Sequence, residues 1–430
     1  MERDVRRETW DVPERFTLSG MTSLWHPFAD MHVVQHNPFV VVRGEGCRVF
    51  DEAGNRYLDA TAGLWFANLG YGRLDVADAV RNQLAELFAY HTFTDFATQP
   101  TLDLADRIAA ISPDPNSKVF FTSGGSDAVD TAAKLVRRYH ALTGNPQRSV
   151  IIARDWAYHG MHTYGTSLGG IEPNRTGYGD LVSDIVFVPH DDTEAVEKAI
   201  DHAGADRIAA IFCEPVIGAG GVRPVPTDYL LSVRDLVRAA GGLFISDEVI
   251  TGFGRMGDWF AANRFGLDPD LILFAKGVTA GYQPLGGVIA SSRVAAPFYD
   301  QPGVIWRHGY TYSGHASACA AGLAVTRIYT EEGVFARALE LEQLLHEAVK
   351  GLVGVGPAVS ARGGTGAMAA LQLDPSDATL SPRVALAVRK AGVITRAIAG
   401  NGLQISPPLI FTDSDVDEMV EGFRTGLTSI

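Results

Sequence analysis

Seven short apolar runs between residues 119 and 290 constrain the fold of this chain more than any other feature. They read VFFT (119–122), SVIIA (149–153), DIVFV (184–188), IAAIF (208–212), LFIS (243–246), LILFA (271–275) and GGVIA (286–290). Because they are apolar almost throughout, each is expected to be a strand buried on both faces. Stretches at 126–142, 192–203 and 227–240 have helical spacing. This pattern predicts an α/β fold with a large, mostly parallel seven-stranded sheet covered by helices.

The chain on either side of this region predicts a second, smaller unit. Residues 40–60 are typical of a β-hairpin, and residues 358–430 mix short strands with a closing helix. We expect these two parts to pair with each other. The predicted organisation is a large α/β domain over residues 75–315 and a discontinuous small α+β domain over residues 1–74 and 316–430, with an N-terminal arm.

Charge and cysteine content exclude several classes of partner. The formal net charge is -14, so the chain has no basic surplus with which to bind nucleic acid or an anionic membrane. Its three cysteines are an odd number and far apart, which argues against disulfides or zinc and for a reducing compartment. No apolar run approaches the roughly 20 residues that span a bilayer, and MERDVRRETWDVPERF lacks the apolar core of a secretory signal. We expect a cytoplasmic protein.

A glycine-rich turn follows the first apolar run, in the sequence SGGSDAVD. Gly124 and Gly125 permit a tight turn, and Ser126 is suited to capping the next helix. Backbone N–H groups at a helix N-terminus, with a nearby hydroxyl, can hold a phosphate group. The simpler alternative is a serine-capped helix without a ligand. No G-K-[ST] follows, so the turn is not a P-loop.

Two ionisable residues stand at the ends of two other predicted strands. Asp247 follows LFIS, and Lys276 follows LILFA. A buried carboxylate is costly without a partner, so Asp247 belongs either to a structural ion pair or to a binding site. A buried lysine has a lowered pKa and suits Schiff-base formation, whereas a structural lysine would extend its amine to water. In open α/β sheets ligands bind beyond these strand ends.

Aromatic and histidine residues follow SVIIA, in the sequence WAYHGMHTYG. Tyr158 can stack on a flat ring. His159 and His162 lack a third ligand in any recognised spacing, so we expect core or loop histidines and no metal site. Together the acid, amine, phosphate turn and aromatic surface are what pyridoxal 5′-phosphate (PLP) requires: the amine forms a Schiff base, and the acid keeps the ring nitrogen protonated.

The stretch FISDEVITGFGRMG offers two interpretations. Gly252, Gly254 and Gly257 spell the G-x-G-x-x-G of a dinucleotide-binding turn. Such a turn places its first glycine at the strand end and opens a helix under a pyrophosphate. Here Asp247 occupies the strand end. We therefore expect the acid to carry the chemistry, while the glycines lead the chain away beside a bound ring.

Motifs over nearly the whole chain resemble those of the class III (ω-amino acid) aminotransferases, which are fold type I PLP enzymes. The matching stretches, in order, are AGLWFANLGYG, SGGSDAVDTAAKLVRRYH, YHG, EPVIGAGGV, DEVITGFGRMG, AKGVTAGYQPLGG, HGYTYSGHASACAAGLA and SPPLIFT. Their order and spacing make the resemblance specific. Within the family the chain is most similar to the (S)-selective amine:pyruvate transaminases.

The resemblance implies roles for the residues of a cofactor site. Lys276 is the Schiff-base lysine and moves a proton between substrate and cofactor, and Asp247 is the partner of the pyridinium nitrogen. Val249 and Tyr158 pack the two faces of the ring. The implied cofactor-binding set is Gly125, Ser126, Tyr158, His159, Glu214, Asp247, Val249, Lys276 and, from the neighbouring subunit, Thr311. A homodimer, or a tetramer built from such dimers, with active sites at the subunit interface is therefore implied.

The resemblance also implies a substrate pocket formed by Trp65, Phe93, Tyr158 and Arg396. Arg396 matches a mobile arginine that binds a substrate carboxylate and swings away for uncharged amines. A guanidinium can grip a carboxylate with two hydrogen bonds, which suits this task. The alternative is a surface arginine with a solvated partner.

Three positions depart from the family pattern. Asp127 stands where glutamate is usual, Val129 where asparagine is frequent, and Ala316 where proline is common. All three lie near the phosphate turn or near Thr311. We therefore expect these departures to affect cofactor affinity or subunit contacts.

The implied reaction is a ping-pong transamination. An amino group moves from a primary amine or ω-amino acid to a keto acid, which we expect to be pyruvate. An aminomutase or racemase would retain the same cofactor residues. A nucleotide-dependent dehydrogenase would use the glycine motif, and a binding protein without activity would tolerate loss of Lys276.

Overall fold

The structure, a computed structural model, describes residues 23–36 and 38–430. The first 22 residues, which include the start of the expected N-terminal arm and the segment where we expect no secretory signal, lie outside this described part. Among the described residues, no helix is long and apolar enough to cross a membrane.

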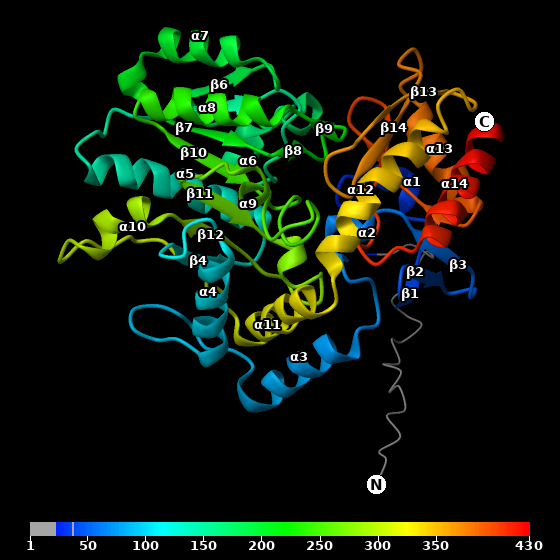
Figure 1. The fold of residues 1–430 in the computed structure, drawn as a ribbon, viewed down its shortest axis with the longest axis horizontal. Helices are drawn as coiled ribbons and strands as arrows, with labels where there is room; N and C mark the ends of the chain where they lie inside the picture. Colours follow the sequence, from blue (N-terminus) through cyan, green and yellow to red (C-terminus); the bar gives the residue numbers. More distant parts are fainter. Residues whose placement is uncertain (1–22, 37) are drawn as a thin grey trace.

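All seven apolar runs form strands of one sheet (Figure 1). The order of strands across it is β4-β12-β11-β10-β7-β5-β6. β12 pairs antiparallel with β11 and β4, whereas the other neighbouring strands pair in parallel. The predicted fold class, α/β with a mostly parallel seven-stranded sheet, is confirmed. The strands are β4 (Lys118–Thr122), β5 (Val150–Arg154), β6 (Ile185–Val188), β7 (Ile208–Cys213), β10 (Leu243–Asp247), β11 (Leu271–Phe274) and β12 (Gly286–Ala290).

Helices cover both faces of this sheet, which explains why its strands lack polar alternation. On β11, Leu273 packs in a cluster that includes α5 (Gly125–Leu142). Its neighbour Phe274 faces the opposite cluster, which includes α8 (Thr227–Ala239). Both faces of the strand therefore gain hydrophobic burial, at about 25 cal/mol per Å² of apolar surface.

The remaining helices lie around the large sheet and beside the smaller ones. α11 (Ala316–Glu331) packs against α3 (Leu74–Leu87) and α4 (Gln99–Ile111), and these three lie together at the bottom of Figure 1. The others are α1 (Met31–Val34), α2 (Ala62–Trp65), α6 (Thr163–Leu168), α7 (Thr193–Ala203), α9 (Ala261–Phe265), α10 (Ser292–Tyr299), α12 (Val334–Lys350), α13 (Leu380–Lys390) and α14 (Asp413–Thr428).

Two four-stranded sheets lie to the right of the large sheet in Figure 1. In the first, β3 pairs in parallel with β15, so an early segment of the chain is joined to a late one. The bounds of two separate domains stay a prediction. The strands are β1 (Val41–Glu45), β2 (Arg48–Asp51), β3 (Arg56–Asp59) and β15 (Val393–Ile394) in the first sheet, β13 (Ala358–Arg362), β14 (Ala369–Leu373), β17 (Gly402–Ile405) and β16 (Ala397–Ile398) in the second, and the pair β8 (Val216–Ile217) and β9 (Arg223–Pro224).

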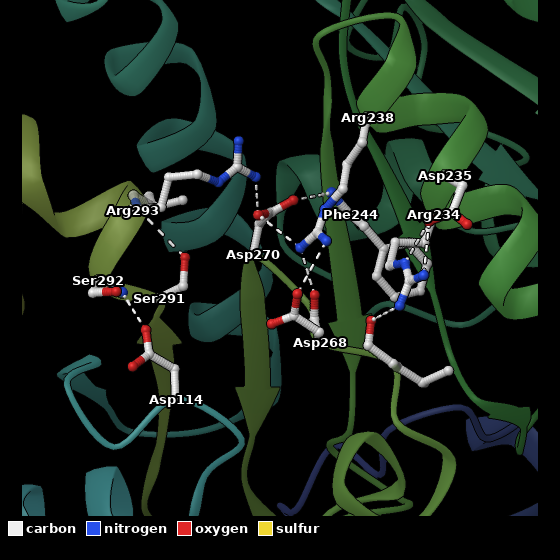
Figure 2. A network of polar contacts seen from close by, with 12 residues as sticks. Asp114, Arg234, Asp235, Arg238, Phe244, Asp268, Asp270, Ser291, Ser292 and Arg293 are labelled. Carbon is white, nitrogen blue, oxygen red and sulfur yellow. Dashed lines mark hydrogen bonds and ion pairs between the residues drawn. The ribbon is translucent and has the colours of Figure 1, made fainter.

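A buried carboxylate ties together the amino ends of β10 and β11 (Figure 2). Asp270, just before β11, is 1 % exposed and accepts the backbone N–H of Phe244 at 2.8 Å. Its other oxygen lies 3.3 Å from Nη2 of Arg238 and also pairs with Arg293. Because the two parallel strands are fixed at this end, their carboxyl ends, which lead to Asp247 and Lys276, lie side by side.

Candidate active site

A cavity of about 420 Å³ lies at the carboxyl ends of the parallel strands. This volume is within the range of small-ligand sites, about 300–1,000 Å³. Eight of the nine predicted cofactor residues line the cavity: Gly125, Ser126, Tyr158, His159, Glu214, Asp247, Val249 and Lys276. Segments that are distant in the sequence therefore converge at the position that the strand ends predict.

Asp247 ends β10 and places a buried carboxyl group in this cavity, where it is 4 % exposed. Its Oδ2 lies 2.6 Å from Nδ1 of His159, and its Oδ1 accepts the backbone N–H of Val249 at 3.2 Å. These contacts fix the orientation of the carboxylate. In the part of the chain that the structure describes, no group of three His, Cys, Asp or Glu side chains is placed to hold a metal ion.

Lys276 follows β11 and places its side chain in the same cavity. Burial lowers the pKa of its amine to about 8, although Asp247 and Glu214 oppose the shift and Arg396 adds to it. The backbone of Lys276 has a φ of 47°, in a region that residues with a side chain rarely occupy. Such strain concentrates at functional sites and costs about 1–3 kcal/mol. Lys276 is partly buried, and its side chain lines the cavity.

Glu214 follows β7 and orders the neighbouring loops. It is 3 % exposed and accepts the backbone N–H groups of Tyr158 at 2.9 Å and Gly218 at 3.0 Å. Burial raises the pKa of its carboxyl group, and these two donors act in the opposite direction. Glu214 therefore fixes the backbone that presents Tyr158 to the cavity.

The predicted phosphate turn forms the N-terminus of α5. A Cβ on Gly125 would lie 2.9 Å from Cγ1 of Val249, so a larger residue would fill the cavity there. Ser126 does not cap the helix, because the N-cap is Gly124 and the hydroxyl of Ser126 accepts the N–H of Met161 at 3.2 Å. The first N–H groups of a helix have no partner inside it and can bind an anion.

The three positions that depart from the family pattern, Asp127, Val129 and Ala316, each have contacts or burial within the fold. Asp127 accepts the backbone N–H of Ser123 at 3.0 Å and lies 3.3 Å from the ring of His162. Val129 is buried and lines the cavity, and Ala316 is buried at the start of α11. Asp127 therefore braces the phosphate turn from within.

The glycines of FISDEVITGFGRMG belong to the loop between β10 and α9. Hydrogen bonds to Glu248 hold this loop in place. The Glu248 carboxylate accepts the N–H of Ala262 at 2.9 Å and also that of Ala261, at the start of α9. The Gly252 N–H returns to the carbonyl of Glu248 at 2.9 Å. Since α9 has only five residues and Asp247 holds the strand end, this loop does not have the geometry of a dinucleotide-binding turn.

Arg396 and Trp65 lie together beside Lys276. The guanidinium of Arg396 stacks over the Trp65 ring at 4.8 Å from its centroid, and the Lys276 Nζ lies 6.0 Å from the same centroid. The Arg396 Nε donates to Oε1 of the buried Gln404 at 3.1 Å. Within the described chain no carboxylate forms an ion pair with Arg396. It is therefore not a surface arginine with a solvated partner.

Phe93 and Thr311 lie outside the cavity of this single chain. Phe93 is 48 % exposed, and Thr311 is exposed too. They belong to neighbouring surface segments, since a Cβ on Gly309 would lie 3.3 Å from the Phe93 ring. The structure does not bring these two residues together with the other predicted site residues.

Sequence reasoning missed several residues that shape the site. Phe66, Thr279 and Gln283 line the cavity, and Gln404 contacts Arg396. Phe66 stands within AGLWFANLGYG and the next two within AKGVTAGYQPLGG, so their position in matching motifs was the available signal. Their side chains have no chemistry that marks a site in a linear sequence.

The donor set of the cavity fits PLP. An amine and a carboxylate line the same cavity, as a carbonyl group and a protonated ring nitrogen require. Gly125 leaves room at the N-terminus of α5, where a phosphate group is stabilised. Tyr158 and Val249 supply an aromatic and an aliphatic surface for the ring.

Comparison with known proteins agrees with this geometry. Residues 31–427 match the aminotransferase class-III family. The putrescine–pyruvate aminotransferase of Pseudomonas aeruginosa is 36% identical, with 92% of this chain and 91% of that protein covered.

Two solved structures share the fold. An (S)-enantioselective ω-transaminase from Thermomicrobium roseum has a TM-score of 0.93 at 34% identity, covering 98% of this chain and 99% of that one. A PLP-bound amine transaminase from an uncultivated Pseudomonas species has a TM-score of 0.91 at 35% identity, covering 95% and 99%. The chain belongs to the class III aminotransferases, which transfer amino groups with the help of PLP.

Proposed function

We propose that the amino donor of this transaminase is a primary amine or an ω-amino acid and that the acceptor is pyruvate. The observation that carries the proposal is Arg396, a cation stacked on Trp65 beside the Lys276 amine and held by a neutral amide instead of a carboxylate. A guanidinium in this position can take the carboxylate of a keto acid. The names of the relatives, which include a pyruvate aminotransferase, support the same acceptor.

We propose Lys276 and Asp247 as the catalytic residues. When bound, PLP accepts the substrate's amino group and delocalises the electrons of the bond that breaks. The Lys276 amine, with a pKa of about 8, can take a proton from the substrate carbon and return it. The Asp247 carboxylate, oriented by His159 and the Val249 N–H, stabilises a positive charge on the ring nitrogen.

The other proposed residues bind and orient. Gly125 and Ser126 would receive the phosphate group, while Tyr158 and Val249 would enclose the ring. Glu214 and His159 would hold Tyr158 and Asp247 in place. Trp65, with Phe93 from the exposed segment, would shape the substrate pocket, and Arg396 would discriminate acids from uncharged amines.

We propose a homodimer, or a tetramer built from such dimers, in which Thr311 reaches the phosphate turn of the neighbouring subunit. Support comes from an exposed aromatic cluster that includes Tyr90, Phe93 and Phe96, each 48 % exposed. Contiguous exposed apolar groups of this kind mark protein contacts. We also propose a cytoplasmic location, which the three free, buried cysteines support.

A donor panel tests the proposed function. Purified holoenzyme is mixed with 1-phenylethylamine, an ω-amino acid or an α-amino acid, each with pyruvate or 2-oxoglutarate. We expect aryl ketone and alanine to form from 1-phenylethylamine and pyruvate. An aminomutase or racemase would form neither product, and activity confined to α-amino acids would contradict the proposed donor class.

The Lys276→Ala variant tests the proposed base in the same assay. We expect loss of turnover with retained folding, and Lys350→Ala, at an exposed lysine, serves as the matched control. Unchanged transamination by Lys276→Ala would contradict its assigned role.

A further inference from the structure

A second cavity, of about 310 Å³, lies between β9 and β13 and shares no residue with the catalytic cavity. Its polar lining is basic throughout, with two arginines and two histidines. The residues that line it are His190, Arg223, Pro224, His346, Ala361, Arg362 and Gly363. It joins the strand pair β8–β9 beside the large sheet to the small sheet that carries β16 and β17.

The two guanidinium groups lie next to each other beside Gly221. A Cβ on Gly221 would lie 2.9 Å from Nη1 of Arg362 and 3.5 Å from Nε of Arg223. Arg223 donates to the Gly220 carbonyl at 2.9 Å and stacks on the Trp156 ring at 4.0 Å. Arg362 donates to the Gly221 carbonyl at 3.2 Å. Both side chains are therefore oriented before any ligand arrives.

In the described part of the chain, neither of these two positive charges has an ion-pair partner. Over the residues that the structure describes, no carboxylate forms an ion pair with Arg223 or Arg362, whereas Arg264 is 2.6 Å from Glu342. Burial lowers the pKa of Arg223 to about 10, and Arg362 adds to that shift. Asp191, the acid that acts on Arg223, is itself 56% exposed and lies 3.5 Å from His190. Two adjacent cations in a partly buried cavity repel each other unless an anion neutralises them.

We propose that the Arg223–Arg362 pocket binds a phosphate group. Each guanidinium has five N–H donors in a planar fork that matches the spacing of phosphate oxygens. One donor of each is used on a backbone carbonyl, which leaves several for a ligand in the cavity that both side chains line. His190 and His346 line the same space and offer further N–H donors. This number of donors exceeds what the two oxygens of a carboxylate can accept.

A phosphate bound there would connect two parts of the molecule close to the substrate arginine. The pocket adjoins the turn that follows Arg396, because a Cβ on Gly400 would lie 3.3 Å from Nη2 of Arg223. In the same turn, the Ala399 N–H donates to the Ala219 carbonyl at 3.4 Å. Binding at the pocket therefore stabilises the contact between β9 and β13.

Calorimetric titration of the PLP-loaded holoenzyme tests the proposal, since the loaded cofactor site cannot take free phosphate. The probes are inorganic phosphate and glycerol 3-phosphate, titrated at constant ionic strength against a chloride blank. We expect one saturable site per chain and a higher melting temperature in phosphate. If both probes bind, the pocket accepts a phosphate group that is attached to a metabolite. If inorganic phosphate alone binds, the ligand is the free phosphate ion.

Variants of the two arginines locate the site. Arg223→Gln and Arg362→Gln should each weaken phosphate binding about tenfold or more, since each removes charge-assisted hydrogen bonds. Arg327→Gln, which removes an exposed arginine that is 4.0 Å from Glu331, should leave binding unchanged. If a glutamine variant fails to fold, Arg362→Lys retains the charge but loses the fork, and it should bind more weakly than the wild type. Absence of saturable binding, or equal affinity in all variants, would overturn the proposal.

Discussion

At the scale of single residues, the chemistry of this site depends on how burial competes with charge around Lys276. Burial disfavours the ammonium form, while Asp247 and Glu214 favour it. Burial dominates, so the pKa falls from 10.5 to about 8. An amine with this pKa is partly uncharged near neutral pH, which is the form that reacts with a carbonyl group.

The first prediction concerns the pH dependence of cofactor uptake by the apoenzyme. Because the pKa of Lys276 is lowered, the amine is charged below about pH 8 and uncharged above it. The rate at which apoenzyme takes up PLP should therefore rise with pH and level off above about 8, as measured by stopped-flow absorbance. A rate that stays flat between pH 6.5 and 9 would show that deprotonation of Lys276 does not limit uptake.

A second prediction concerns Arg396, which has no carboxylate ion-pair partner among the described residues. Arg396→Ala should raise KM for pyruvate and lower kcat/KM about tenfold to a hundredfold, since a charged hydrogen-bonding partner of the acid is lost. The half-reaction with 1-phenylethylamine should change little, because that donor has no carboxylate. Arg383→Ala, at an exposed arginine on α13, is the matched control. Equal losses for both substrates would contradict a role specific to the acid.

At the scale of elements, the loop after β10 depends on one buried acid. Glu248 is fully buried, and its carboxylate accepts N–H groups from Ala261 and Ala262 together with the hydroxyls of Ser246 and Thr251. Burial raises its pKa to about 7, against the opposing effect of these donors. Since Asp247 is the adjacent residue, the same anchor also fixes the end of β10.

Glu248→Ala should therefore destabilise the fold by about 2–4 kcal/mol, because several buried donors lose their acceptor. The shift in thermal melting of the holoenzyme measures this effect, and Glu340→Ala, an exposed glutamate on α12, is the control. A melting temperature equal to that of the control would show that the loop does not need this anchor.

The same elements show what the sequence can and cannot predict. Local patterns predict the seven strands, because burial on both faces removes polar alternation. They also point to Asp247 and Lys276, because ligands bind beyond the carboxyl ends of strands in open α/β sheets. The Gln404–Arg396 contact could not be predicted in this way. It joins side chains across the β16–β17 hairpin, and no periodicity specifies a rotamer. The pocket at Arg223 and Arg362 likewise depends on two strands that are distant in the sequence.

At the scale of the whole molecule, the single chain leaves part of its predicted site on the outside. Eight cofactor residues line the cavity, whereas Thr311 and Phe93 are exposed. The proposed dimer resolves this difference, because residues exposed on one chain would complete the cavity of the other. In a two-fold symmetric pair, each subunit would give its Thr311 and receive that of its partner.

Subunit complementation tests this arrangement with two variants that are each inactive as homodimers. Lys276→Ala lacks the reactive amine, and Thr311→Asp would place a negative charge against the phosphate group of the neighbouring subunit. In a mixed dimer, one site receives both defects, while the other combines an intact Lys276 with an intact Thr311. Random assembly should therefore restore about a quarter of wild-type activity, since half of the dimers are mixed and each has one working site. If activity does not return when the two variants are co-expressed and the mixed dimers are isolated, Thr311 does not act across the interface.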